Sequence, residues 1–375
     1  KGALSVGTSE RKIILKNISK SFENKNTNTP LHVLDNVSLD VYENEFLVLF
    51  GPGQCGKTVL LNIMAELQAP DTGEVIYTDN RKVHGDIGVV FQQYALFPWK
   101  TVIQNVEMNQ KFKGMNKAER REQAQQYIKL VGLEGFENKY PAQLSGGMKQ
   151  RVGIARAYAT NSDIILMDEP FGALDAQTRY QMQEEILRIW EQKKVTIVFI
   201  TNNVEEAVTL GDRIVIMRDG FIQQIGTPQE VFNHPANLFV AGFIGTPQMN
   251  FFDATLSKKG DKYVATVQGK DFELPADKQE ALKKMDKIPT DIIAGVRPVH
   301  VHLSDDGIDA TVDVSELMGS ELHLHVNSNG KDVVIVVPTT DIDVGAVHGG
   351  HKPVKYSFRP ELMHFFDKET EKNIF

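Results

Sequence analysis

A glycine-rich segment, GPGQCGKT at residues 51–58, has the residue types and the spacing that bind phosphate groups. It fits the pattern G-x-x-x-x-G-K-[ST], follows a predicted buried strand, EFLVLF (45–50), and precedes a predicted helix over 57–67. Glycine lets such a loop curl so that its backbone N–H groups face the phosphates, and the helix N-terminus adds positive potential. Lys57 is expected to reach the β- and γ-phosphates of a nucleotide, and the Thr58 hydroxyl to bind Mg²⁺. A chance glycine loop is the alternative.

A second apolar run, IILMDEP at residues 164–170, ends in two acids. Asp168, at the end of this predicted strand, is suited to hold the water shell of a Mg²⁺ ion. Glu169, next to it, is placed to polarise an attacking water. The alternative is a solvated acidic turn with no chemistry, but the phosphate loop upstream favours a site that cleaves a phosphate bond.

These residues must be positioned by a regular framework, and the pattern of apolar residues predicts one. Strands alternate with helices, two of which are predicted over 117–131 and 179–194, so we expect a mainly parallel sheet with helices on both faces. After about residue 240 the pattern changes to short alternating strands, typical of a small all-β barrel or sandwich. We therefore predict an α/β domain over 1–240 and a β domain over 241–375.

The bulk composition sets limits on function. The chain has 375 residues, of which 41% are hydrophobic and 24% charged, with a net charge of −8. The acidic balance argues against a general nucleic-acid or anionic-membrane binder, although it allows a local basic patch. The single cysteine, Cys55, excludes an internal disulfide. No apolar stretch approaches the length of a membrane span and no signal peptide is expected, so any membrane spans would have to come from another chain.

Several longer motifs carry a resemblance to a known family. They are VVFQQYALFPW (89–99), LSGGMKQR (144–151), MDEPFGALD (167–175) and TNNVEEA (201–207). Together with the phosphate loop, they make residues 12–240 resemble the nucleotide-binding subunits of ABC transporters. The resemblance implies an α/β P-loop NTPase fold with an antiparallel β subdomain and a helical subdomain.

The resemblance also implies roles for individual residues. Glu169, Gln92 and Asn202 form the implied catalytic set, and Thr58, Gln92 and Asp168 the implied Mg²⁺ set. Asp175 resembles the residue that couples the two sites of a dimer. Phe22 resembles an aromatic that stacks on adenine, with an ordinary core phenylalanine as the alternative. The implied nucleotide contacts are Phe22, Gly51, Gly53, Gln54, Cys55, Gly56, Lys57, Thr58, Val59, Ser145, Gly146, Gly147 and Asp175.

The partners follow from the same resemblance. In the family, the segment Ser145–Gly147 clamps a nucleotide bound to a second ATP-binding subunit, so a homo- or heterodimer is implied, with ATP and Mg²⁺ as ligands. The aromatic segment YALFPW (94–99) corresponds to the groove for a transmembrane permease subunit. An extracytoplasmic solute-binding protein is then an indirect partner, nucleic acid is not expected, and the chain is placed peripherally on the cytoplasmic face of the membrane.

The cargo stays open, because two parts of the chain resemble different importers. FPWKTVIQNV (97–106) and KAERREQA (117–124) look most like importers of nitrate, taurine and alkylsulfonates. The end of the chain, including GVRPVHVHL (295–303), resembles the OB- and TOBE-like regulatory barrel of sugar importers. A soluble ABC protein of translation or DNA repair is a third alternative, but such proteins usually carry two ATPase modules.

Four positions depart from the family pattern. Asn202 and Asn203 stand where histidine and aspartate are usual, Gln54 replaces a glycine of the phosphate loop, and Val59 replaces a hydroxyl. Asparagine can donate a hydrogen bond to a phosphate but cannot carry a proton as imidazolium does. Glu169 favours an active ATPase, since a chain that no longer hydrolysed ATP would have no need of this carboxylate. A slow ATPase and a binding-dominated subunit of a heterodimer therefore both remain.

The β domain is rich in histidine. Seven of the ten histidines lie between residues 300 and 364. His300 and His302 are predicted on one strand face, and His323 and His325 on the same kind of face of another strand. Neighbouring H-x-H strands could bind Zn²⁺. We favour the alternative that these histidines fill the polar faces of amphipathic strands.

Overall fold

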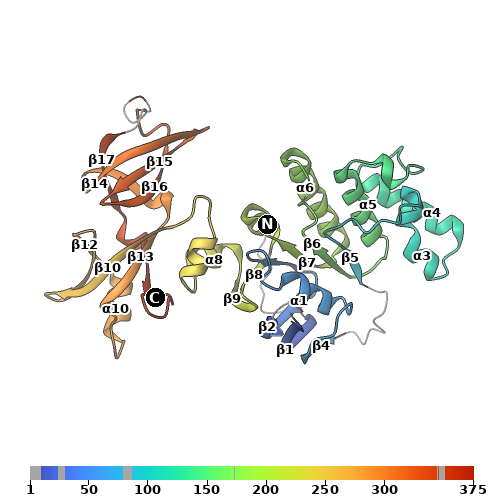
Figure 1. The fold of residues 1–375 in the computed structure, drawn as a ribbon, viewed down its shortest axis with the longest axis horizontal. Helices are drawn as coiled ribbons and strands as arrows, with labels where there is room; N and C mark the ends of the chain where they lie inside the picture. The colour runs from blue at the N-terminus through green and yellow to red at the C-terminus, as the bar shows by residue number, and fades with distance from the viewer. Residues whose placement is uncertain (1–9, 24–29, 79–86, 173, 344, 346–350) are drawn as a thin grey trace. The chain divides into compact units, whose positions relative to one another are not determined.

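The chain folds into two compact units. The structure is a computed structural model, and it describes residues 10–23, 30–78, 87–172, 174–343, 345 and 351–375. The internal contacts of the chain fall into two units, Lys1–Gln229 and Glu230–Phe375 (Figure 1). The division differs from the predicted one after residue 240. Helix α9 belongs to the second unit because its Ala241 is buried against Met249 and Phe366.

The centre of the first unit is a mostly parallel sheet. Within the described residues, six strands lie in the order β5-β6-β7-β3-β8-β9, and only the pair β8–β9 is antiparallel. Residues of β3, β6 and β7 are buried throughout, as expected of parallel strands covered on both faces. The bounds are β3 Phe46–Phe50, β5 Gly88–Val90, β6 Ile164–Asp168, β7 Thr196–Thr201, β8 Arg213–Arg218 and β9 Phe221–Gly226.

A separate antiparallel sheet packs beside it. Three described strands, in the order β2-β1-β4, form this sheet, and their apolar residues share one core with β3 and α1. The predicted antiparallel β subdomain is therefore present. The bounds are β1 Arg11–Glu23, β2 Pro30–Tyr42 and β4 Thr72–Tyr77.

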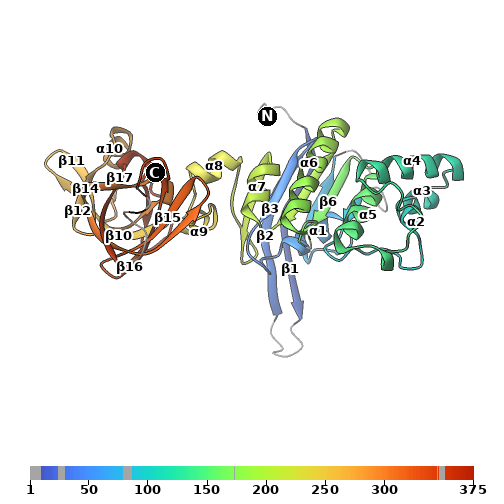
Figure 2. The same cartoon turned by 90° about the horizontal axis from the view of Figure 1, so that it is seen from above.

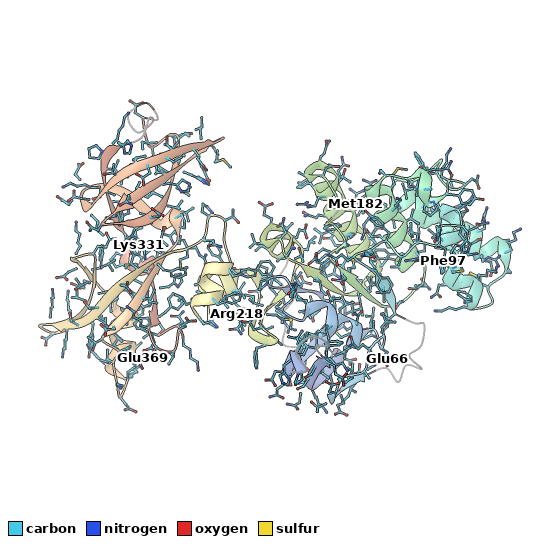
Figure 3. The ribbon with its side chains drawn as sticks, in the orientation of Figure 1. Glu66, Phe97, Met182, Arg218, Lys331 and Glu369 are labelled. Atoms are coloured by element: carbon cyan, nitrogen blue, oxygen red, sulfur yellow. The ribbon has the colours of Figure 1, made fainter. Side chains whose placement is uncertain are left out.

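The helices of the first unit begin and end where local sequence signals place them. Helix α4 is followed by Gly132 with φ of 68°, a left-handed conformation that glycine adopts readily at a helix end. Helix α1 ends at Met64, earlier than predicted, and Glu66 (labelled in Figure 3) has a left-handed φ of 55°. Helix α6 buries Met182 and starts at Ala176, because Asp175 caps it. The bounds are α1 Lys57–Met64, α2 Val102–Val106, α3 Met108–Phe112, α4 Lys117–Leu130, η1 Pro141–Gln143, α5 Gly146–Tyr158, α6 Ala176–Lys193 and α7 Val204–Leu210.

The second unit is dominated by strands. Its described strands form two antiparallel sheets, β12-β11-β10-β13-β18 and β16-β15-β14-β17, which share one core. Figure 2 shows these strands curving around a common interior. The bounds are α8 Pro228–Asn233, α9 Leu238–Phe243, β10 Asn250–Lys259, β11 Lys262–Val267, β12 Lys270–Glu273, α10 Ala276–Lys283, β13 Asp291–Val296, η2 Pro298–His300, β14 Val301–Met318, β15 Glu321–Ser328, β16 Lys331–Pro338, β17 Lys352–Phe358, η3 Pro360–Leu362 and β18 His364–Asp367.

The histidines of this unit are arranged partly as predicted. His323 and His325 are half-buried on β15 and alternate with buried apolar residues. His300 does not share a strand face with His302, because Pro298 starts a short 3₁₀ turn that ends at His300. Over the described part of the chain, no three His, Cys, Asp or Glu side chains are grouped so as to hold a metal ion. Over the same residues, no helix is long and apolar enough to cross a membrane.

Candidate functional site

The phosphate loop connects β3 to α1, and two of its glycines have no room for a side chain. A Cβ on Gly51 would lie 2.3 Å from the carbonyl oxygen of Met217. Gly56, the N-cap of α1, has φ of 100°, and a Cβ there would lie 2.7 Å from the carbonyl oxygen of Val33. These glycines let the backbone curl tightly at the start of the helix, which is the geometry that phosphate binding requires.

At positions 53 and 54 of the loop, the glycine is not at the position where the backbone favours one. Gln54 adopts a left-handed φ of 63°, a conformation that glycine takes at little cost. Gly53 does not lie in that region, and a Cβ added to it would meet no atom within 4 Å. Gln54, which replaces a glycine of the family pattern, therefore holds a backbone conformation that costs a residue with a side chain more than it costs glycine.

The side chains of the loop point in different directions. Lys57 is buried, and its Nζ donates to the carbonyl oxygens of Gly51 at 2.8 Å and Pro52 at 2.7 Å. Its ammonium therefore lies over the loop that would receive the phosphates. The thiol of Cys55 is buried 3.7 Å from that ammonium, and burial raises the pKa of the thiol. Val59 is half-buried and packs against the core.

A hydroxyl and a carboxylate meet where the loop approaches the end of β6. Thr58 Oγ1 donates to Asp168 Oδ1 at 3.2 Å, although the two residues are far apart in the sequence. Asp168 is buried, which raises the pKa of its carboxyl, while the hydrogen bond from Thr58 opposes that rise. Two hard oxygen donors in this position are the kind of ligand that Mg²⁺ prefers.

The three residues of the predicted catalytic set line one cavity. Gln92 Nε2 donates to Glu169 Oε2 at 3.1 Å, and Asn202 stands on the same cavity wall. The backbone at Glu169 is held out of the strand conformation, with φ of 42° and its N–H bonded to the carbonyl of Ile200. The cavity has a volume of about 330 Å³ and is lined by Gln92, Glu169, Gly172, Arg179, Thr201, Asn202, Asn203 and Glu206.

Sequence reasoning missed three of the residues that line this cavity, Thr201, Glu206 and Arg179. Glu206 is buried and accepts a hydrogen bond from Thr201 Oγ1 at 2.5 Å, and Arg179 Nε lies 3.6 Å from its other oxygen. Burial raises the pKa of the Glu206 carboxyl. Glu206 lies inside the TNNVEEA motif, but its partner Arg179 comes from α6, so only the packing of α6 against α7 could reveal the pair.

The residues implied to act across a dimer do not line this cavity. Ser145 is the N-cap of α5, and its Oγ accepts from Met148 N at 3.3 Å. Gly146 and Gly147 are the first residues of that helix. Asp175 caps α6, and its hydrogen bonds from the backbone N–H and the hydroxyl of Thr178 hold the pKa of its carboxyl below the usual range.

Two aromatic positions are exposed. The Phe22 side chain is 39% exposed on β1, with Lys20 Nζ 5.8 Å from its ring centroid, so it is not a core residue. Trp99 is 70% exposed, and its ring centroid lies 5.8 Å from that of Phe97, which Figure 3 labels. Asn105 holds this segment, because its Oδ1 accepts from Phe97 N at 2.8 Å. Both aromatics are thus available to an external ligand or partner.

Comparison with known proteins gives the family. The sequence matches the models of three domains: ABC transporter (residues 34–172), MalK OB fold domain (245–301) and TOBE domain (294–366). It is 34% identical over 368 residues to the ABC transporter ATP-binding protein YcjV of Escherichia coli strain K12, covering 95% of this chain and 98% of that protein. The chain belongs to the ATP-binding proteins of ABC transporters. This ATP-binding protein is also 35% identical over 356 residues to the oligosaccharides import ATP-binding protein MsmX of Bacillus subtilis strain 168, covering 91% of this chain and 94% of MsmX.

Solved structures agree with this assignment over the first unit. The dimeric structure of MJ0796, a bacterial ABC transporter cassette, is 38% identical with a TM-score of 0.54, and it covers 58% of this chain and 98% of that one. A post-hydrolysis state of the same cassette, bound to ADP and phosphate, is 37% identical with a TM-score of 0.53. The predicted ABC ATPase fold, followed by an OB- and TOBE-like β domain, is confirmed.

Proposed function

We propose that this ATP-binding protein hydrolyses ATP and thereby energises a binding-protein-dependent importer. The observation that carries the proposal is the hydrogen bond of 3.1 Å between Gln92 and Glu169 inside the cavity that Asn202 also lines. A carboxylate held by an amide, next to a phosphate loop, is the arrangement that activates a water toward a terminal phosphate.

The nucleotide is bound by the first unit. Its phosphates lie along the loop backbone, and Lys57 exchanges the carbonyls of Gly51 and Pro52 for phosphate oxygens. Phe22 offers its exposed ring to the adenine. Thr58 and Asp168 would supply oxygen ligands for Mg²⁺, together with Gln92, and the ion would neutralise phosphate charge when bound.

Hydrolysis uses the residues of the cavity. Glu169 accepts a hydrogen bond from the attacking water and draws its proton as the oxygen approaches the γ-phosphorus. Gln92 keeps the Glu169 carboxylate oriented, and Asn202 donates an amide hydrogen to the γ-phosphate. The bond from the γ-phosphorus to the ADP oxygen then breaks, leaving ADP and phosphate.

The working unit is a dimer. Ser145 is exposed at the start of α5, and Gly146 and Gly147 leave its N-terminal donors accessible. These donors clamp the nucleotide of a second ATP-binding subunit, and Asp175 couples the two sites. The dimeric MJ0796 cassette supports this arrangement.

The cargo class is a saccharide. The relative MsmX, whose name gives oligosaccharide import, matches both units of this chain rather than the ATPase unit alone. The nitrate, taurine and sulfonate alternatives rest on segments of the first unit only. Transmembrane permease subunits dock on the segment around Trp99, whose side chain is exposed. In this proposal the protein lies peripherally on the cytoplasmic face of the membrane.

A hydrolysis-impaired regulatory subunit is the second candidate. Asn202 favours it, because an amide cannot carry the proton that an imidazole could, and so does Val59, which packs into the core where a hydroxyl could have bound phosphate. In this case a different ATP-binding chain completes a heterodimer with one competent site.

Steady-state phosphate release with Mg-ATP separates the two candidates. The native chain is measured with and without its permease subunits, beside Glu169→Gln and Asn202→His. Turnover that Glu169→Gln abolishes supports the ATPase. No turnover even with the permease, together with ATP-dependent dimerisation, establishes the regulatory subunit instead.

A further inference from the structure

A basic cavity lies among the helices of the first unit, away from the phosphate loop. It has a volume of about 270 Å³ and is lined by Lys100, Gln104, Glu107, Met108, Lys111, Lys117, Arg120 and Arg121. Helices α2, α3 and α4, which supply most of these residues, lie side by side in Figures 1 and 2. Of the described lining residues, five are cationic and one is acidic, whereas the whole chain carries a net charge of −8.

The acidic residue organises two of the cations. Glu107 is only 7% exposed, and its carboxylate lies 3.4 Å from Arg121 NH1 and 3.5 Å from Arg120 Nε. Arg120 NH1 also donates to the carbonyl oxygen of Met115 at 3.2 Å. The two guanidinium groups are therefore held in place, with the Arg121 side chain 38% exposed and that of Arg120 16% exposed. One carboxylate neutralises one of them, so the wall keeps an excess of positive charge.

The three lysines are not neutralised. Over the described residues, the side-chain nitrogens of Lys100, Lys111 and Lys117 have no hydrogen-bond or ion-pair partner. Lys117 is the first residue of the 14-residue helix α4, whose N-terminus already carries positive potential and favours acidic neighbours. Lysine and arginine side chains placed there repel one another and the helix dipole. An anion bound in the cavity would attract both these side chains and the positive end of the helix dipole.

Phe112 is 80% exposed and follows Lys111, which lines the cavity. Trp99, which precedes Lys100, belongs to the segment that we propose as the permease dock. Aromatic rings next to lysine and arginine are typical of surfaces that meet the headgroup region of a membrane. The volume is below the roughly 300 Å³ of pockets that hold drug-sized ligands, and so it suits a single small group.

We propose that this cavity binds a phosphate group, supplied either by the headgroup of an anionic phospholipid or by free phosphate. In the first case the protein contacts the membrane surface itself, in addition to its permease. The arginine guanidinium groups donate paired hydrogen bonds to two phosphate oxygens. The lysine ammonium groups supply the remaining positive charge that balances the phosphate.

The test uses the purified full chain and two double variants. Lys111→Gln/Lys117→Gln removes two cations from exposed residues, so the fold should survive. Lys283→Gln/Lys284→Gln is the matched control, because it removes the same charge from exposed residues of the second unit. Each protein is co-sedimented with vesicles of phosphatidylcholine, with and without phosphatidylglycerol, and is titrated with inorganic phosphate by calorimetry. Phosphate bound at the phosphate loop contributes equally to all three proteins.

The expected result is binding to phosphatidylglycerol vesicles that is weakened about tenfold in Lys111→Gln/Lys117→Gln and unchanged in the control. A variant-sensitive phosphate isotherm without vesicle binding supports the same site with free phosphate as its source. The proposal is overturned if both double variants bind vesicles and phosphate as the native chain does. It is also overturned if Lys111→Gln/Lys117→Gln loses only permease stimulation of ATP turnover, because the cavity then receives a protein carboxylate.

Discussion

In the phosphate loop, glycine occupies position 53, although the left-handed backbone that favours glycine is at position 54. Exchanging the two, with glycine at 54 and alanine at 53, should stabilise the protein. Gln54 has a left-handed φ of 63°, which costs a side-chain-bearing residue about 1–2 kcal/mol. Gln54→Gly removes that cost but adds about 0.4–1 kcal/mol of unfolded-state freedom, leaving a gain of about 0.5–1 kcal/mol. At Gly53, a Cβ meets no atom within 4 Å, so Gly53→Ala should gain a further 0.4–1 kcal/mol or so.

Thermal unfolding measures both effects. A gain of about 1 kcal/mol corresponds to roughly 2–4 °C for a unit of this size, and Gln54→Gly/Gly53→Ala together should reach about 3–6 °C. Gln54→Ala is the control, because it removes the same side chain without relieving φ. The reasoning is wrong if Gln54→Gly melts no higher than Gln54→Ala, or if Gly53→Ala is as damaging as Gly51→Ala, whose Cβ would meet a carbonyl oxygen at 2.3 Å.

Three further predictions follow from the same geometry. Asn202→His should raise steady-state phosphate release at least about tenfold if a missing charge-stabilising contact limits turnover, and an unchanged rate would show that residue 202 is not limiting. Gly56→Ala should lower the free energy of unfolding by more than about 1 kcal/mol in a urea titration, because its Cβ would lie 2.7 Å from the carbonyl oxygen of Val33; a neutral result would mean that the loop relaxes freely. Burial, helped by Arg297, lowers the pKa of His364 from its ordinary 6.5 to about 4, so the unfolded chain binds this proton more readily than the folded one. The second unit should therefore lose up to about 3 kcal/mol of stability as the pH falls from about 6.5 to 4, and His364→Phe should remove that dependence; an equally steep pH profile in the variant would contradict the assignment.

The local parts of the site were predictable because their signals lie within a few residues. The strand, loop and helix around residues 45–64 follow from an apolar run, a glycine pattern and a helical start, and the structure places them as expected. The replacement of a family glycine by Gln54 was visible in the sequence, and the left-handed φ at this residue is a local property of the loop. The acids that end β6 were predictable for the same reason.

Features that depend on packing between distant segments were not predictable. The buried pair of Glu206 and Arg179 needs α6 and α7 to meet, and the basic cavity needs Lys100 to meet the start of α4. The boundary between the units lies earlier than predicted because α9 buries one side against residues of the β domain. No local change in composition signals this packing. His300 does not lie on the predicted strand face, because Pro298 favours a turn at that point.

The two asparagines that replace the family's usual residues after β7 differ in what they change. Asn203 Oδ1 accepts hydrogen bonds from the N–H groups of Glu205 at 2.8 Å and Glu206 at 3.2 Å, which is the N-cap role that an aspartate would also fill. Its replacement of aspartate therefore removes a charge but preserves the start of α7 and the position of Glu206. Asn202 is exposed to the cavity, and its side chain makes no hydrogen bond to the described residues. Any functional difference from the family pattern at this strand end should therefore arise at residue 202, and exchanging Asn203 for Asp alone should leave turnover nearly unchanged.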